Sequence, residues 1–299
     1  MIISVSRRTD IPAFYSEWFY NRVREGYFIR VNPYNPAQRK RISLERQDVD
    51  AFVFWSKNPR PLLRYLPWLD DHGYPYYFLF TVNDYPELFE PRVPGLNRRV
   101  ETFRLLSTML GPERVIWRYD PIILSSLTTE QFHLETFARI AEMLTGYTKR
   151  VIISFLDSYP KVKRAFARLD PENSLQICEP QIGGGQTALL ELSEGLSAIA
   201  AERQIAVYSC SEKLDLSQCQ VNRGSCIDGI LINKLFQLQL PLRKDPAQRP
   251  ECGCVPAVDM GIYNTCEYLC SYCYANGHPE IVGRTVRGYN PDSPVLIEK

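Results

Sequence analysis

The sequence has almost no net charge, few histidines and no long apolar run. Its 35 basic and 34 acidic residues give a formal net charge of +1. This balance excludes a bulk polycation, so a nucleic-acid footprint would have to be local. No apolar run reaches the roughly 18 residues that a membrane span requires. The three histidines, His72, His133 and His278, do not cluster, and we assign them no catalytic role.

Features of secretion and of dinucleotide binding are also missing. At the start of the chain, MIISVSRRTD, the apolar residues precede the arginines, which is the reverse of a signal peptide. We therefore expect a cytoplasmic chain. No G-x-G-x-x-G motif follows a candidate strand, so the fingerprint of a dinucleotide-binding doubly wound sheet is absent. Hydrophobic residues make up 45% of the sequence, which is enough for an ordinary core.

The first two-thirds of the chain repeats an apolar strand, a few polar residues and a helical stretch. The candidate strands are Ile2–Val5, Tyr27–Val31, Ala51–Trp55, Tyr76–Val82, Val115–Tyr119, Val151–Phe155 and Ile205–Tyr208. The candidate helices are Ala13–Glu25, Pro61–His72, Leu96–Leu110, Thr129–Thr145, Lys161–Leu169 and Gln186–Arg203. Apolar strands that alternate with helices indicate parallel βα units covered on both faces. We predict an α/β fold of the (β/α)₈ parallel barrel type, with an open doubly wound sheet as the alternative.

Polar and charged residues follow most of these strands. In a barrel the C-terminal strand ends converge on one mouth, where the chemistry lies. Capping of the next helix is an equally good explanation for Asp10, Asn58 and Asp157. Capping explains the cations poorly, because a cation is disfavoured at the positive N-terminus of a helix. The cations that we expect to face an anionic ligand across the mouth are Arg7, Arg8, Lys57 and Arg118.

Arg118 and Asp120 are alternate residues of one strand, so both side chains can point into the mouth. Arg118 could hold a carboxylate or phosphate and Asp120 a ribose or amine, or both could form a salt bridge, with each other or with a neighbour. Trp55 beside Lys57 could stack on a base, although such a residue is more often core or rim. The candidate catalytic residues are Arg7, Lys57, Arg118 and Asp120.

Cysteines are concentrated at one end of the chain. Eight of the nine lie from residue 210 onward. In a chain of this length, a dense cluster at one end predicts metal binding rather than disulfides. We therefore divide the sequence into a βα-repeat body, residues 1–209, and a cysteine-rich segment, residues 210–299, which belong to one structural unit.

The strongest motif is the C-x₃-C-x₂-C spacing of Cys266, Cys270 and Cys273. Three thiolates from one short loop can bind three irons of a 4Fe–4S cluster. The fourth iron would stay open for a substrate or cofactor. Zinc loops favour C-x₂-C pairs and four closed ligands, and only His278 lies nearby as a fourth. The spacing therefore favours iron–sulfur over zinc.

A second group of cysteines surrounds the C-x-C pair Cys252 and Cys254, with Cys210, Cys219 and Cys226 upstream. Four thiolates from separate loops would make a closed site, either an auxiliary 4Fe–4S cluster or structural zinc. The alternative is that these cysteines bind no metal and pack as small hydrophobic residues. The close spacing of the C-x-C pair argues against that alternative.

The three-cysteine loop, with Tyr272 just before its last cysteine, resembles the cluster loop of the radical S-adenosylmethionine (radical SAM) superfamily. Its flanks, Gly261–Thr265 and Cys273–Ala275, resemble the spore photoproduct lyase-like branch, and this is the one feature that suggests a nucleic-acid substrate. The whole chain also resembles a bacterial family with the motif at its C-terminus. In that family the start Ser4–Asp10, the run Trp55–Pro59 and the C-terminal cysteines recur together, without an established substrate.

The superfamily resemblance implies that the three cysteines of this loop ligate the cluster and that Tyr272 lies beside the adenine of SAM. Reductive cleavage of SAM would give a 5′-deoxyadenosyl radical that removes a hydrogen atom from the substrate. A reductant such as flavodoxin or ferredoxin would supply the electron. No clear glycine-glycine-acid motif is present for the SAM amino group, and Asp10, Asp120 or Glu212 could substitute.

The family resemblance favours one set of ligands for the second site and leaves Cys219 and Cys178 outside it. That set is Cys210, Cys226, Cys252 and Cys254. The usual radical SAM proteins carry their cysteine loop after the first barrel strand. Here Val258–Tyr263 is a candidate strand directly before the loop, and pairing beside Ile2–Val5 would close the barrel in a circularly permuted form. The rival functions are an iron–sulfur electron carrier or sensor without SAM chemistry, and a barrel hydrolase with structural metals.

Overall fold

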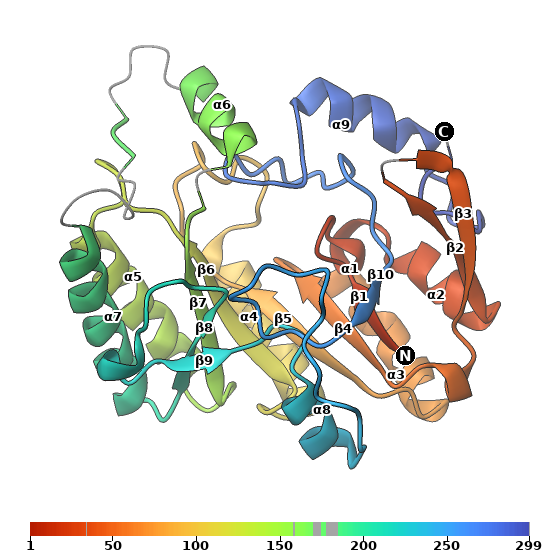
Figure 1. The fold of residues 1–299 in the computed structure, drawn as a ribbon, viewed down its shortest axis with the longest axis horizontal. Coiled ribbons are helices and arrows are strands. Elements are labelled where there is room, and N and C mark those ends of the chain that lie inside the picture. The colour runs from red at the N-terminus through yellow and green to blue at the C-terminus, as the bar shows by residue number, and fades with distance from the viewer. Residues whose placement is uncertain (34, 158, 170–174, 178–184, 299) are drawn as a thin grey trace.

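The computed structural model describes the chain except residues 34, 158, 170–174, 178–184 and 299 (Figure 1). Its main feature is an eight-stranded sheet in which every neighbouring pair is parallel. In spatial order the strands are β10 (Ala257–Asp259), β1 (Ile2–Val5), β4 (Ala51–Ser56), β5 (Tyr76–Thr81), β6 (Val115–Ile122), β7 (Arg150–Phe155), β8 (Ala206–Cys210) and β9 (Asn222–Gly224). The predicted α/β fold with a parallel sheet is confirmed.

Most of the helices cover one face of this sheet, and those that we predicted begin and end close to the expected positions. The helices Gly229–Phe236 and Pro279–Thr285 were not predicted. The helices are α1 (Ile11–Phe14), α2 (Ser16–Arg24), α3 (Leu66–Asp71), α4 (Leu96–Leu110), α5 (Glu130–Leu144), α6 (Pro160–Leu169), α7 (Gly185–Glu202), α8 (Gly229–Phe236) and α9 (Pro279–Thr285). Short 3₁₀ turns are η1 (Arg46–Asp48), η2 (Arg60–Tyr65), η3 (Ser217–Cys219) and η4 (Val286–Gly288). The predicted helix Ala13–Glu25 is two helices, α1 and α2, and the predicted helix Pro61–His72 begins as η2. No helix in the described part of the chain is long and apolar enough to cross a membrane.

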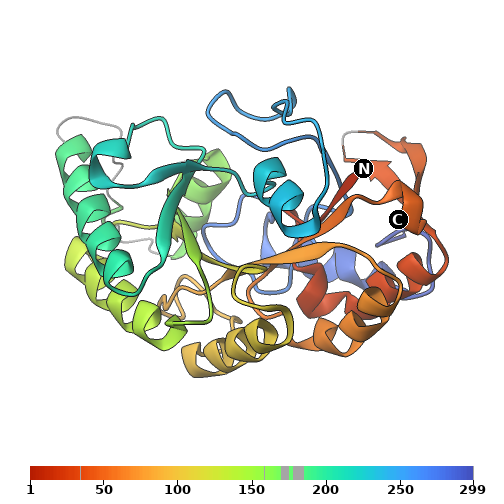
Figure 2. The ribbon, with the colours of Figure 1, turned by 90° about the horizontal axis from the view of Figure 1, so that it is seen from below.

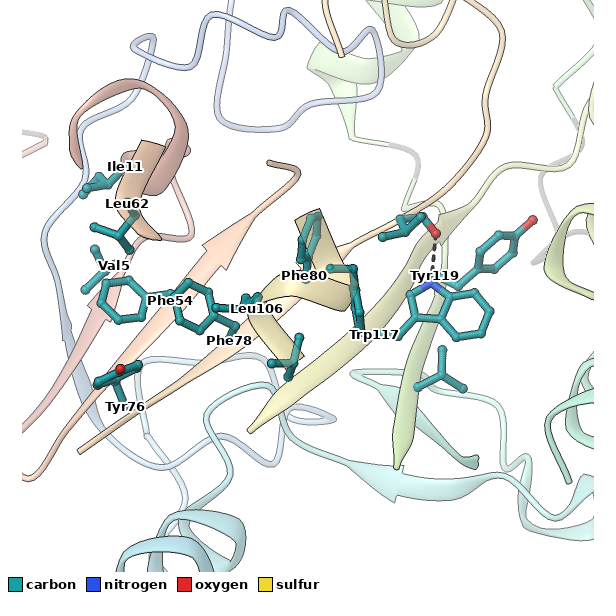
Figure 3. Packing of buried hydrophobic residues seen from close by; sticks show 14 of the residues in the cluster. Val5, Ile11, Phe54, Leu62, Tyr76, Phe78, Phe80, Leu106, Trp117 and Tyr119 are labelled. Carbon is teal, nitrogen blue, oxygen red and sulfur yellow. Dashed lines mark hydrogen bonds between the residues drawn. The ribbon is translucent and has the colours of Figure 1, made fainter. Parts of the chain in front are cut away.

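The inner strands β4 to β7 are largely buried on both sides, as parallel strands usually are, whereas the edge strand β9 is partly exposed. Phe52, Phe54 and Phe78 point toward the helices, and Figure 3 shows how Phe54, Phe78, Phe80 and Trp117 lie along that core. The alternate residues Val53 and Leu79 point to the other face. There they pack on α8 and on the second group of cysteines. Figure 2 shows α8 on the opposite side of the sheet from α4. The cysteine-rich segment therefore belongs to the core of the fold.

The prediction that Tyr27–Val31 is a strand of the parallel sheet is wrong. Residues Tyr27–Asn32 form β2, which pairs with β3 (Asn35–Ser43) in a separate antiparallel hairpin. Phe28 and Ile42 are buried, but seven of the nine residues of β3 are exposed. The apolar run of β2 therefore covers the edge of the core with one face, which a sequence pattern does not distinguish from a buried strand.

The strands follow one another across the sheet in chain order once this hairpin is set aside, apart from the last strand, β10, which lies next to the first. That order is the order of a barrel, without the reversal of a doubly wound sheet. Within the described residues, β9 and β10 are the two edges and do not pair with each other. Closure into a full barrel is therefore not shown.

The predicted strand before the cysteine loop lies where we expected it, although it is shorter. It spans Ala257–Asp259 rather than Val258–Tyr263 and runs parallel to β1, with Ile3 opposite Val258. The carboxylate of Asp259 accepts hydrogen bonds from the Ser4 Oγ (2.9 Å), the Ser6 Oγ (2.7 Å), the Arg7 N–H (2.9 Å) and the Gly261 N–H (2.9 Å). One carboxylate thus joins the ends of the first and last strands.

We predict that Asp259→Ala lowers the free energy of unfolding by about 3 to 5 kcal/mol, because four donors lose a charged acceptor together. Urea unfolding followed by circular dichroism measures this change. The matched control is Asp71→Ala, an exposed aspartate at the end of α3, which should change the stability by less than about 0.5 kcal/mol. Equal stability of the two variants would contradict a joining role for Asp259.

Candidate metal and cofactor centre

A cavity of about 440 Å³ lies at the C-terminal ends of the parallel strands. Residues from the C-terminal ends of β4 to β8 and from the loops after β1, β4 and β7 line it, together with the cysteine-rich segment. All seven cysteines that we assigned to metal sites border this cavity, as do Arg7, Lys57, Arg118, Asp10, Asp120 and Tyr272. Glu212 does not. The structure therefore brings together all but one of the predicted site residues.

The three-cysteine loop is fixed to the fold through its backbone. The Tyr15 hydroxyl donates to the Thr265 carbonyl (2.6 Å), and the Asn276 amide donates to the Cys266 carbonyl (2.7 Å). Gly261, just before the loop, approaches β1 so closely that a Cβ atom there would lie 2.0 Å from the Ser6 Oγ. The residues outside the loop thus determine its position.

The three thiols of this loop are half-buried at the cavity. Burial raises the pKa of Cys270 to about 12, and it also raises the pKa values of Cys266 and Cys273. A thiol binds a metal only as the thiolate, so metal binding here would release protons. The predicted zinc alternative used His278, but His278 is the N-cap of α9, its side chain is 47% exposed, and it does not border the cavity.

Beside this loop lies a buried ionic group that sequence reasoning missed. Glu90 accepts a hydrogen bond from the Lys57 Nζ (2.7 Å) and another from the Tyr272 hydroxyl, and Arg99 lies 3.8 Å away. Burial alone would raise the pKa of Glu90, but Lys57 and Arg99 hold it below its ordinary value. Glu90 thus orients both Lys57 and Tyr272. It lies in the loop between β5 and α4, where no motif marks it.

The second group of cysteines comes from three separate segments. The Cys210 and Cys226 sulfurs are 3.2 Å apart, and the Cys254 sulfur accepts a hydrogen bond from the Ile227 N–H (3.3 Å). Cys226, Cys252 and Cys254 are buried, and the sulfurs of Cys252 and Cys254 interact strongly enough to shift each other's pKa. The segments that carry the four cysteines therefore meet, as one site requires.

The remaining cysteines lie elsewhere. The Cys219 thiol donates to the Leu190 carbonyl (3.4 Å) and does not border the cavity, which agrees with its place outside the predicted set. Cys178 falls outside the described residues. As the side chains stand, no three Cys, His, Asp or Glu side chains in the described part of the chain are arranged to hold a single metal ion.

Arg118 and Asp120 form the salt bridge that we predicted as an alternative to separate ligand contacts. Asp120 also accepts a hydrogen bond from the Ser154 Oγ (2.5 Å). The Trp55 ring has the Arg118 guanidinium at 4.8 Å and the Arg7 guanidinium at 5.7 Å from its centre. Trp55 therefore contacts two cations at the cavity, rather than presenting a free face for stacking.

We predicted three acids as possible ligands of the SAM amino group, and they differ in the contacts that their carboxylates already make. Asp10 caps α1 by accepting from the Ala13 N–H (3.0 Å) and also accepts from the Lys57 N–H (2.7 Å), and burial raises its pKa to about 6. The capping role of Asp10 is confirmed. Both oxygens of Asp120 are engaged, as described above. Glu212 accepts from the Phe155 N–H (2.8 Å) outside the cavity, so it is misplaced for that role.

The other two predicted caps have different contacts. Pro59, not Asn58, is the N-cap residue of η2, so the capping prediction for Asn58 is wrong. The Asn58 N–H instead donates to the Ser56 Oγ (2.9 Å). Asp157 pairs with Arg249 (2.5 Å) at the cavity.

We predict a pH dependence of stability from Glu212. Burial raises its pKa from 4.5 to about 7. Between these values the folded chain keeps a proton that the unfolded chain releases, so the free energy of unfolding falls as the pH rises. Wild type should lose about 3 kcal/mol more than Glu212→Gln between pH 5 and pH 8. Urea unfolding at both pH values measures the difference, and identical losses in both proteins would contradict it.

Comparisons with known proteins give one match. A domain family described as "Domain of unknown function (DUF1848)" matches residues 2–275. No curated protein and no solved structure matches the chain. The matched range includes the whole parallel sheet, the cavity and both groups of cysteines. The chain therefore belongs to the DUF1848 family.

Proposed function

We propose that this protein is a radical SAM enzyme that binds a 4Fe–4S cluster through Cys266, Cys270 and Cys273. The observation that carries the proposal is the position of this loop. Its three cysteines border one cavity together with the cations at the strand ends. A loop that served only as a fold-stabilising zinc site would need a fourth ligand, and the nearest histidine faces solvent instead.

The residues present fit a three-ligand cluster site. Cysteine is the usual ligand of such clusters, and the loop supplies three from a short segment whose backbone is held from outside. The absence of a ready single-ion arrangement does not bear on a cluster, since a cube of four irons holds its cysteines further apart than one ion does. When bound, the cluster would supply reductive cleavage of SAM to a 5′-deoxyadenosyl radical.

The chain's own residues would bind, orient and shield the reactants, since the cofactors carry the chemistry. Glu90 locks the Tyr272 hydroxyl, so the ring cannot turn away from the cysteine loop. Lys57 is held by the same carboxylate at one wall of the cavity. Asp120 and Arg118 form another wall, supported by Ser154. These contacts favour a preformed site in which a reactive species is kept from water.

We also propose that the sheet is a circularly permuted form of the (β/α)₈-type barrel of radical SAM proteins. The parallel pairing of β10 with β1 supports this proposal. Because β10 runs in the same direction as the other strands, the cysteine loop that follows it emerges at their C-terminal ends. A loop after the first strand of an ordinary barrel would emerge at the same end.

The second group of cysteines would hold either an auxiliary 4Fe–4S cluster or structural zinc. Four thiolates from separate segments complete such a site without an open position. The electron for SAM cleavage would come from a reductant such as flavodoxin or ferredoxin, and we expect these reactions in the cytoplasm.

The decisive experiment is anaerobic reconstitution with iron and sulfide, followed by dithionite and SAM. We expect 5′-deoxyadenosine from wild type and none from Cys270→Ala, which should stay soluble because the half-buried Cys270 side chain contributes little to the strand-and-helix core. Cys254→Ala should be poorly folded, because a closed site that joins three segments contributes folding energy directly. Cys219→Ala, a buried cysteine outside both groups, is the matched control and should behave as wild type.

Cluster-loaded wild type that binds no SAM and yields no 5′-deoxyadenosine would overturn the proposal and leave an iron–sulfur electron carrier. Full activity of Cys270→Ala would show that the three-cysteine loop is not the cluster site.

The metal content gives a separate prediction. Anaerobically purified protein should contain about eight irons per chain if both sites hold 4Fe–4S clusters, and about four irons plus one zinc if the second site is structural. Elemental analysis measures both metals in one sample. Neither iron nor zinc above background would contradict both assignments.

A further inference from the structure

Three buried N–H groups at the cavity have no acceptor among the described residues. They are the Arg7 Nη2, the Trp55 Nε1 and the Arg118 Nε. All three residues border the same cavity, and the two guanidinium groups lie within 6 Å of the Trp55 ring centre. A buried donor without an acceptor is unfavourable because it has lost its hydrogen bonds to water, so a ligand with several lone pairs would be stabilised there.

The charges at this place favour an anion. Arg118 is paired with Asp120, whose other oxygen is occupied by Ser154, so this carboxylate is largely neutralised. The Arg7 side chain forms no salt bridge in the part of the chain that the structure describes, although the nearby Asp259 carboxylate is one of the groups that raise its pKa. Its backbone is held on both sides, by its N–H to Asp259 (2.9 Å) and by the Tyr274 hydroxyl to its carbonyl (2.6 Å). The Arg7 guanidinium therefore borders the cavity without a directly paired carboxylate.

On the basis of the proposed function, we infer that Arg7, Trp55 and Arg118 bind an oxyanion of the substrate, a carboxylate or phosphate group. Guanidinium groups present paired N–H donors that match the oxygens of both groups. The indole N–H supplies a third, uncharged donor. The substrate would thus lie between the two groups of cysteines, with its anionic end at these three residues.

Two other acceptors compete for the same donors, and the experiment must separate them. Cys226 and Cys254 lie near Arg7, so a metal–thiolate centre at the second site could accept its N–H groups. The carboxylate of SAM is the other candidate. The protein is therefore studied with its metals bound, first without SAM and then with it.

Metal-loaded protein is titrated by calorimetry with inorganic phosphate and, separately, with acetate, in a buffer free of other oxyanions. We expect one saturable site per chain for at least one probe, and the preferred probe identifies the group. Arg7→Met should weaken binding at least tenfold, and Trp55→Phe, which removes only the N–H donor, should weaken it several-fold. Arg249→Met is the matched control, because this cavity arginine is already paired with Asp157 (2.5 Å), and it should bind within twofold of wild type.

The metal content of each variant is measured alongside the titration. If Arg7→Met loses metal, its weaker probe binding no longer tests the inference, and the Trp55→Phe result is used instead. No saturable binding of either probe by metal-loaded wild type would overturn the inference, as would equal binding by wild type and Trp55→Phe. Displacement of the probe by SAM, one for one, would assign the three donors to SAM and also overturn the inference.

Probe binding without 5′-deoxyadenosine formation would refute the proposed function alone, whereas 5′-deoxyadenosine formation without probe binding would refute this inference alone.

Discussion

The pairing of β10 with β1 is the constraint on which the candidate site depends. These strands are separated by most of the chain, and the Asp259 carboxylate joins their ends through four hydrogen bonds. Two of the donors, the N–H groups of Arg7 and Gly261, lead directly into the two segments that meet at the cavity. The same carboxylate therefore positions the cation of one segment and the cysteine loop of the other.

Charge inside the cavity is arranged in small, nearly neutral groups. Lys57 faces Glu90, Arg118 faces Asp120, and Arg249 faces Asp157. In the two largely buried pairs, Lys57–Glu90 and Arg118–Asp120, desolvation offsets the attraction, so the net gain in stability is small. The Arg249–Asp157 pair is more exposed, and water screens its attraction. The effect of each pair is on geometry, since each partner fixes the other. Arg7 differs from these cations because its side chain faces thiols and an aromatic ring, not a carboxylate that pairs with it.

Much of the fold could be predicted from the sequence, because most strands of the sheet, such as Tyr76–Thr81, are apolar for most of their length. The edge strand Asn222–Gly224 has no apolar side chain, and the pattern did not predict it. The strand Ile2–Val5 and the helix Leu96–Leu110 begin and end where the pattern placed them. The hairpin β2–β3 could not be predicted, because the apolar residues of Tyr27–Asn32 give the same pattern whether one face or both faces of the strand are covered.

The candidate site could also be predicted only in part. Cysteines at close spacing are a local signal, and all seven of the assigned cysteines border one cavity. Glu90 and Asp259 are single acidic residues whose importance comes from partners far away in the sequence. Local pattern and spacing therefore carry no signal for them. Glu212 is the opposite case, because we predicted it at the mouth and it does not border the cavity. Its carboxylate follows a strand directly but accepts a hydrogen bond from the Phe155 N–H.

The order of the segments has a consequence for biosynthesis. Strands β1 to β8 and their helices precede six of the seven cavity cysteines along the chain. Domains tend to fold from the N-terminus during synthesis, at about 5–20 residues per second. The body of the sheet can thus form on the ribosome with β1 paired to β4 but not yet to β10, and most of the thiols emerge only after that body. Late exposure of the thiols would limit their premature oxidation or capture of the wrong metal.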